Sequence, residues 1–454
     1  MSLYNVLNTA RRALSASQYG INITGHNLAN ATTPGYTRQR VNLAPVRGME
    51  GPYGVIGGGV EVVGLERLRD AIIDATYRRE VSFRSNIDFQ RGILEQIEAA
   101  VAELTPAGVS NALSGLFDAW SELATNPAGL TQRDGVRQAA SVLIQRLNNI
   151  AVRFSQIVTE AESNLGADIK RFNQIVAEIA NLNRAIVKTE ALGTPAADLR
   201  DARDAALDRL AELMEIRTVE QDDGSVTVIA GDAILVDRAT YREIEFRLAG
   251  TTYSIHYVGE PIQLYVSGGR IGGELEILNA IIPGVTAELD AFVHTLVTEV
   301  NNLHRAGTTL SGATGIDFFD PAGVTAATIR LSNEVQASRE NVVAGFTGMP
   351  GDGDVANAIA ELRNTPLAAH GGDTLPGAYA AFNARLGLQI ENAQNVIAAQ
   401  DSLITQLEQR RLSVSGVSTE EELVMLMEYQ HAYLAAARVV MTADELLRSL
   451  IEMV

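Results

Sequence analysis

Apolar residues at both ends of the chain recur at alternating spacings of three and four. Such a repeat keeps one stripe of a helix turned toward a partner helix. We therefore expect a helix at each end, the two paired as a coiled coil. The first stripe contains Leu3, Leu7, Ala10, Leu14, Ser17, Ile21, Thr24 and Leu28, and the last contains Leu423, Leu426, Gln430, Tyr433, Ala437, Val440, Asp444, Leu447, Ile451 and Val454.

The two ends carry opposite net charges. Residues 1–50 hold five arginines and one glutamate, a net charge of +4, whereas residues 401–454 hold four arginines and nine carboxylates, a net charge of −5. Opposite charges favour pairing of the two ends with each other over pairing of each end with its own kind. The alternative is two ordinary amphipathic surface helices whose charge difference is accidental.

The interior predicts three further long helices. Apolar spacing over 136–179 predicts a helical region of about fifty residues, much longer than an average globular helix. Similar patterns over 83–104 and 386–407 predict two more. The last pattern stops at the sequence SVSGVS, where Ser418 followed by Glu421 predicts a capping box that begins the terminal helix.

One region changes from a helical period to a period of two. Residues 244–248 and 253–257 alternate between apolar and polar side chains, and glycine-containing turn dipeptides separate such runs. These features predict a small β-rich insertion over 216–274. The glycine-rich run 51–64 predicts a hairpin after the first helix, and 327–331 predicts a short strand.

A chain of 454 residues is too long for one simple core, so several domains are expected. The predicted fold class is mainly α with an inserted β domain. Residues 1–62 with 412–454 form the terminal coiled coil, and 63–215 with 275–411 form a core of long bundled helices. Residues 216–274 form the small β-rich outer domain.

Composition and motifs argue against several classes of function. A net charge of −19 lacks the basic face of a nucleic-acid-binding protein, and no apolar stretch approaches the roughly 20 residues of a membrane span. There is no cysteine, and the six histidines are scattered without metal-ligand spacing, so no catalytic, cofactor or metal residue is predicted. One charged cluster is interpreted as a solvated, ion-paired helix face. It contains Asp198, Asp201, Asp204 and Asp208 among Arg200, Arg203 and Arg209.

Two terminal segments resemble a known family. GHNLANATTPGYTRQRVNL (25–43) is similar to the N-terminal signature of the flagellar axial proteins of rod, hook and hook-associated type. LMEYQHAYLAAARVVMTADELLRSLI (426–451) resembles their matching C-terminal signature. Segments 116–148 and 199–231 resemble the hook-associated branch more than the hook or rod subunits. The family core appears here at Ala29, Asn30, Thr33, Pro34, Gly35 and Tyr36.

The resemblance implies a structural subunit, not an enzyme, that joins the flagellar hook to the filament. It implies an extracellular protein, exported by the flagellar type III apparatus without a cleaved signal peptide. The implied partners are further copies of the chain, hook protein, hook-associated protein 3 and an export chaperone. The predicted assembly interface consists of Leu3, Leu7, Leu14, Ile21, Leu28, Asn30, Pro34, Gly35, Tyr36, Leu423, Leu426, Tyr433, Val440, Leu447 and Ile451.

Two alternatives stay open. A hook or distal rod subunit of the same family shares both terminal signatures, and a flagellum-associated secreted hydrolase needs a concave site with a pair of carboxylates. Ordering a backbone costs about 1–2 kcal/mol per residue, and a single helix pair buries only part of each helix. We therefore expect both ends to be disordered or frayed in the free monomer and to fold on assembly.

Overall fold

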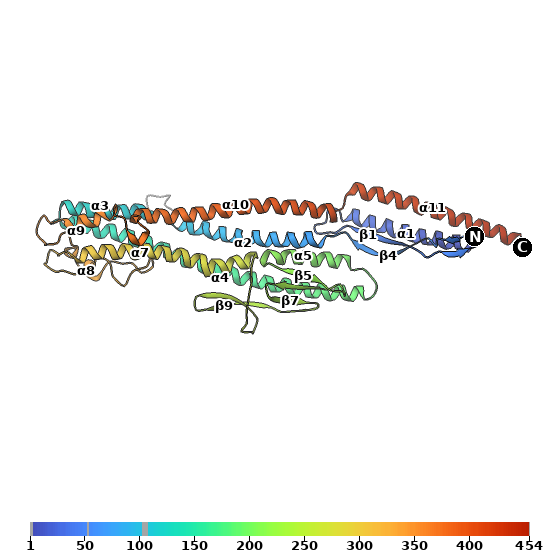
Figure 1. Cartoon of the computed structure of the whole chain (residues 1–454), viewed down its shortest axis with the longest axis horizontal. Helices are drawn as coiled ribbons and strands as arrows, with labels where there is room; N and C mark the ends of the chain where they lie inside the picture. Colours follow the sequence, from blue (N-terminus) through green and yellow to red (C-terminus); the bar gives the residue numbers. More distant parts are fainter. Residues whose placement is uncertain (1–2, 52–53, 102–107, 454) are drawn as a thin grey trace.

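The computed structural model describes residues 3–51, 54–101 and 108–453 as a long rod with both chain ends at the same tip (Figure 1). Helix α1 (Leu3–Ala29) packs beside α11 (Thr419–Glu452) at this tip. Helix α2 (Ala71–Val101) packs along α10 (Leu375–Ser415) in the body of the rod. The predicted fold class, mainly α with an inserted β domain and long helices at both ends, is confirmed.

The longest helix of the body is α4 (Leu130–Glu190), whose 61 residues exceed the predicted length. Its buried side chains follow the predicted spacing of three and four, from Val136 to Ile186. A helix of this length is stabilised mainly by packing of such a stripe and less by local propensity. The elements around it are α3 (Val109–Thr125), α5 (Ala197–Leu213), α6 (Gly269–Glu276), the π-helix η1 (Ile277–Ile281) and α7 (Ile282–Arg305).

The β-rich insertion lies on the flank of α4 and contains two antiparallel sheets (Figure 1). The strands predicted over 244–248 and 253–257 are confirmed as neighbours, and Gly250 between them has φ of +66°, a value that favours glycine. One sheet contains β5 (Arg217–Glu220), β6 (Val226–Ala230), β7 (Ala233–Asp237) and β8 (Thr240–Tyr241) in that order. The other contains β9 (Ile244–Ala249), β10 (Thr252–Tyr257) and β11 (Gln263–Leu264), with β10 central.

Asparagine side chains of the helical body bind the backbone of the insertion. Asn173 of α4 accepts from the Ile244 amide at 2.9 Å and donates to the Ile244 carbonyl at 2.8 Å. Asn279 of η1 does the same with Tyr253, at 2.7 and 2.9 Å. Asn183 of α4 holds β6 in the same way. Each amide replaces a strand neighbour, so the insertion is fixed against the helices by satisfied backbone groups.

A β ribbon connects α1 to the body. It pairs β1 (Gln39–Pro45) with β4 (Val60–Arg67), and a smaller pair, β2 (Met49–Gly51) with β3 (Gly54–Ile56), lies at its end. The hairpin predicted over 51–64 is present only in part: this run supplies the returning strands β3 and the start of β4, whereas their partners β2 and β1 lie mostly before it, and residues 52–53 lie outside the described residues.

The far end of the rod is mostly irregular chain packed on α3, α4 and α7. The strand predicted over 327–331 is wrong: the segment is mainly a turn, and only Leu331 makes a single bridge, to Phe319. The Thr328 amide donates to the Thr325 carbonyl at 3.1 Å, because these threonines favour a local turn over a sheet. Short helices in this part are α8 (Asn333–Ala337), α9 (Asp354–Glu361) and the 3₁₀ turns Arg339–Asn341 and Ala368–His370.

The continuous helix Gly269–Arg305, formed by α6, η1 and α7, corrects one further expectation. By length and composition it is apolar enough to cross a membrane, although the sequence reading found no such stretch. Its apolar side chains Leu289, Phe292, Val293 and Leu296 are buried in the core of the rod. A helix packed in the core of a protein can be as long and as apolar as one that crosses a membrane, so packing against the core accounts for the composition of this helix.

Candidate assembly interface

Helices α1 and α11 run antiparallel at the tip of the rod (Figure 1). Their contacts step by seven residues along each helix. Asn27 donates to Glu422 at 3.0 Å, and Gly20 lies against the ring of Tyr429. The predicted pairing of the two ends within one chain is therefore present in the structure.

The facing surface of this pair, called the seam below, consists mainly of small side chains, with the ring of Tyr429 as a large exception. Small residues allow two helix axes to approach closely. Large apolar side chains also lie outside the seam, and Leu434 and Met441 of α11 are exposed. The buried small residues are Ala10, Ala16, Ser17, Gly20 and Thr24 on α1, and Ala436 and Ala443 on α11.

The predicted interface residues divide into two groups. Leu3, Leu7, Leu14, Ile21, Leu28, Asn30, Tyr36, Leu426, Val440 and Leu447 are half-buried. Pro34, Gly35, Leu423, Tyr433 and Ile451 are exposed.

The stripe of α11 that faces α1 needs a correction. Leu423 is 46% exposed and Ile451 is 73% exposed, so these two do not fill the seam. The seam instead uses Tyr429, Ala436 and Ala443, each one residue before a predicted position. Close helix packing selects small side chains, whereas the hydropathy pattern selects large ones.

The signature turn after α1 is built from hydrogen bonds to the end of the helix. Asn30 donates to the His26 carbonyl at 3.0 Å, and Gly35 has φ of +81°, which favours glycine. The Tyr36 hydroxyl donates to Asn27 Oδ1 at 2.8 Å and lies 2.9 Å from His26 Nδ1. Burial, together with nearby carboxylates, raises the pKa of Tyr36 well above its usual value, so the phenol stays neutral. The turn is thereby folded back against α1.

Glu422 links this turn to the start of α11, and sequence reasoning missed it. The residue is 0% exposed. One carboxylate oxygen accepts from Arg38 Nε at 2.7 Å, and the other accepts from Asn27 Nδ2 at 3.0 Å. Asn27 also bonds the amide and carbonyl of Gln39, so its side chain reaches α1, β1 and α11 together. The only sequence signal was that Glu422 follows the Ser418 cap, whose hydroxyl accepts from the Glu421 amide.

A second buried cluster, called the ionic joint below, connects the ribbon to the body. Asp204 lies 2.7 Å from Arg67 and 3.0 Å from Arg69, and Arg411 lies 2.7 Å from Asp208. Burial alone would raise the pKa of Asp204, but Arg69 and Arg67 hold it below its usual value. The ionic joint consists of Arg67 at the end of β4, Arg69 just after it, Asp74 and Arg78 on α2, Asp201, Asp204 and Asp208 on α5, and Arg411 on α10.

The predicted ion pairing is therefore present and Asp198 is exposed, but the interpretation of Asp201, Asp204 and Asp208 as part of a solvated face is wrong. The ribbon, α2 and α10 cover this face of α5 and supply its arginine partners from distant parts of the chain. The neighbouring arginines of α5 point elsewhere: Arg200 pairs with Glu190 at 2.7 Å and Arg209 pairs with Glu178 at 2.8 Å.

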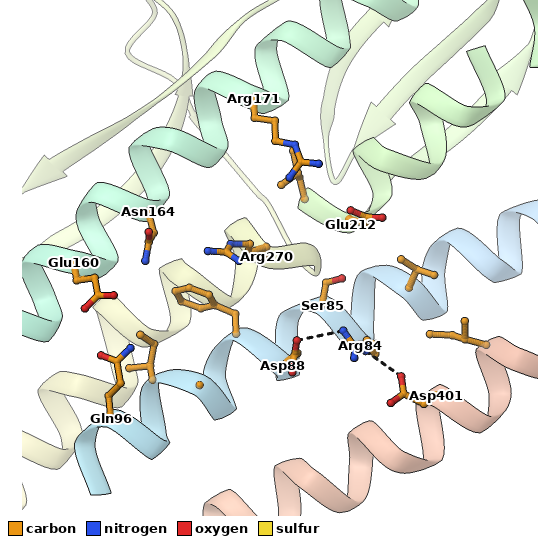
Figure 2. A pocket seen from close by; sticks show the side chains of 16 residues that line it. Arg84, Ser85, Asp88, Gln96, Glu160, Asn164, Arg171, Glu212, Arg270 and Asp401 are labelled. Atoms are coloured by element: carbon orange, nitrogen blue, oxygen red, sulfur yellow. Dashed lines mark hydrogen bonds and ion pairs between the residues drawn. The ribbon is translucent and has the colours of Figure 1, made fainter. Parts of the chain in front are cut away.

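Figure 2 shows a cleft of about 780 Å³ between α2, α4, α6 and α10. Two carboxylates that line it, Asp88 and Asp401, lie 3.2 and 3.1 Å from Arg84, so neither is a free acid or base. No group of three or more potential ligands is arranged for a metal ion anywhere in the described ranges of the chain. Glu160 of α4 and Glu212 of α5 also line the cleft.

Comparisons with known families match both ends and the middle of the chain. The family described as flagellar hook-associated protein FlgK helical domain matches residues 94–319. The families described as flagella basal body rod protein and flagellar basal body rod FlgEFG protein C-terminal match 7–37 and 408–453.

Relatives extend this match over nearly the whole chain. Flagellar hook-associated protein 1 of Bacillus subtilis is 27% identical, covering 99% of this chain and 98% of the relative. The protein of the same name in Escherichia coli is 22% identical, covering 98% and 99%. The structure of the flagellar hook junction protein FlgK from Burkholderia pseudomallei shares the fold, with a TM-score of 0.66 and 15% identity over 75% of this chain and 100% of that one. The chain belongs to the flagellar hook-associated protein 1 family.

Proposed function

We propose that this chain is the structural subunit that joins the flagellar hook to the filament, outside the cell. Membership of its family makes it a component of the flagellum. The observation that carries the assembly mechanism is the distribution of side chains on α11. Small residues fill the seam within one chain, and large apolar residues remain on the outer surface.

These outer residues give neighbouring copies a surface to bind. Leu434 is 55% exposed, and Met441, seven residues further along the same helix, is also exposed. Fully burying one such side chain contributes roughly 1.5–3 kcal/mol. An exposed apolar surface of this kind is typical of an interaction site. The subunits therefore polymerise through their paired terminal helices.

The proposed domain division places the paired terminal helices at the axis of the assembly and the remaining domains further out. Residues 1–62 with 412–454 form the inner, axial layer of a tube, and 63–215 with 275–411 form a second layer. Residues 216–274 form the outer surface. The proposed partners are further copies of the chain, hook protein and hook-associated protein 3, reached after type III export without a cleaved signal peptide and with an export chaperone. No catalytic role is proposed.

The function is tested in a strain that lacks this chain. Intact hooks with filament protein released into the medium support the junction role. Missing hooks would instead support the alternative, a hook or distal rod subunit. Digestion of cell-wall glycan by the purified chain would support the hydrolase alternative.

A pair of matched variants tests the interface itself. Leu434→Gln removes an apolar side chain from the outer surface of α11, and Leu248→Gln removes one of similar exposure, 53%, from β9 of the insertion. We expect the first variant to release filament protein into the medium and the second to swim normally. Equal behaviour of the two variants would contradict assembly through α11.

A further inference from the structure

The small-residue seam does not by itself fix how far α1 and α11 slide along each other. In the structure Asn27 meets Glu422 and Gly20 meets Tyr429, seven residues further along each helix. Continuing in steps of seven places Ala13 opposite Ala436 and residue 6 opposite residue 443. The side chains of Val6 and Ala443 do line one groove at the tip of the pair.

A slide of one heptad would preserve most of this packing. It would place Gly20 opposite Ala436 and Ala13 opposite Ala443, so that small residues again face small residues. Repeated small contacts of this kind specify register weakly, and a buried polar residue is the usual device that specifies it. The slide would displace the end of α11 by about 10 Å.

We propose that Glu422, through Arg38 and Asn27, and the contact of Tyr429 with Gly20 set the register of this pair. Glu422 is buried and its two carboxylate oxygens have different partners, both supplied only in the observed register. A one-heptad slide would bring Asn27 to Tyr429 and leave the carboxylate without that partner. A buried charge without its partner is strongly destabilising.

The Tyr429 contact acts in the same direction. A Cβ at position 20 would lie 2.5 Å from the ring, so this ring requires a glycine opposite it. A slide in either direction places Asn27 or Ala13 there, and both carry a Cβ atom. Gly20 and Glu422 are thus specificity-determining residues of the pair. Register decides which outer side chains of α1 and α11 lie side by side, and hence the surface that a neighbouring copy meets.

Disulfide trapping in assembled full-length chains, in which both terminal helices are expected to be folded, tests the inference, because the natural sequence has no cysteine. The native register is reported by Ala13→Cys with Ala436→Cys, and the slipped register by Ala13→Cys with Ala443→Cys. A disulfide requires Cα atoms within about 7 Å, so each pair reports one register. We expect the native pair to cross-link about tenfold or more in excess of the slipped pair, a ratio that corresponds to about 1.4 kcal/mol or more.

Glu422→Leu is expected to lower this ratio toward one, and Glu422→Gln to lower it partly, because the amide keeps its shape and can still accept from Asn27. The matched control is Glu421→Leu, which removes the neighbouring carboxylate that also binds Arg38, at 2.8 Å, but is exposed. The control should leave the ratio unchanged. Circular dichroism identifies any variant that has lost helix, and if Glu422→Leu has, the ratio of Glu422→Gln decides.

The inference is overturned if wild type shows no preference, or if the Glu422 variants trap the native pair as selectively as the Glu421 control. Either result leaves the junction role intact, because that role is tested in cells by filament loss and not by register. Conversely, a hook or rod phenotype in the deletion strain would leave the trapping result unaffected.

Discussion

Gly20→Ala separates two opposite effects on the same helix. In an exposed helix interior, replacing glycine by alanine stabilises by about 1 kcal/mol. At position 20 the new Cβ would lie 2.5 Å from Cδ1 and Cε1 of Tyr429 and 2.7 Å from Cγ. Carbon atoms pack at about 3.5–4.0 Å, so the two groups must separate by about 1 Å.

The tyrosine ring cannot easily move out of the way. The close contact includes Cγ, at the base of the ring, so rotation about the ring axis does not relieve it. The helices must move apart instead, and this loosens the whole small-residue seam. Overpacking of this kind costs about 1–3 kcal/mol. Against the helix-propensity gain of about 1 kcal/mol, we expect a net destabilisation of the seam by up to about 2 kcal/mol.

Hydrogen exchange of the assembled chain, in which α1 and α11 are expected to be folded, measures this change amide by amide. A loss of up to about 2 kcal/mol raises the exchange rate of α1 and α11 amides by up to about 30-fold. The matched control is Gly25→Ala on the same helix, where no described atom lies within 4 Å of a built Cβ. That variant should slow exchange, and Tyr429→Ala should restore protection in the Gly20→Ala background. Slower exchange in Gly20→Ala itself would refute the proposed close contact.

Four further outcomes follow from buried charges and from the terminal helices. Burial, with a neighbouring aspartate, raises the pKa of Glu274 to about 9, so the free energy of unfolding of the wild type should fall as pH rises from 4.5 toward 9, by about 3 kcal/mol at pH 7. The melting temperature of Glu274→Gln should exceed that of the wild type by a margin that grows from pH 5 to 8. A margin that stays constant over this range would contradict the prediction. Burial lowers the pKa of His304 to about 4, so the contribution of its neutral ring to folding stability is present above pH 6.5 and lost as pH falls toward 4. The fluorescence of the single tryptophan, whose ring lies 6.1 Å from that of His304, should change over this pH range in wild type but not in His304→Gln. Asp204→Ala should destabilise the ionic joint by about 3–5 kcal/mol, and increased proteolysis near the ribbon would report it. Removal of residues 1–40 and 420–454 should cost the free monomer little helix by circular dichroism if these ends fold on assembly.

The sequence predicted the long helices well because each has a large apolar stripe. The spacing from Val136 onward continues through α4, and the alternation over 244–248 marks β9. These elements bury large side chains against a core, and hydropathy measures that burial directly.

The seam was predicted only in part, because in this helix pair small side chains are buried while several large apolar side chains are exposed. Leu426, Val440 and Leu447 are half-buried as expected, but the alternate positions shifted by one residue toward Ala436 and Ala443. Alanine and glycine carry little hydropathy signal, although they permit the closest helix approach.

Buried charges were beyond the reach of sequence patterns for a different reason. Glu422 and Asp204 look like ordinary surface carboxylates, because their neighbours in the sequence are also charged. The arginines that compensate them lie far away: Arg38 is 384 residues from Glu422, and Arg67 is 137 residues from Asp204. Only the folded chain brings these pairs together, so spacing within one helix cannot identify them.

In the pair of α1 and α11, different residues determine the geometry of the pair and its stability. Buried ion pairs such as Arg38 with Glu422 contribute more to specificity than to stability, because desolvation offsets most of their attraction. The seam buries little apolar surface within one chain, since its residues are small. The geometry of the pair is thus set inside the subunit, at the signature turn, whereas the proposed assembly would add stability through neighbours that cover Leu434 and Met441. Changes on the outer face should therefore impair assembly without altering register, and changes at Glu422 should alter register before they impair the helices.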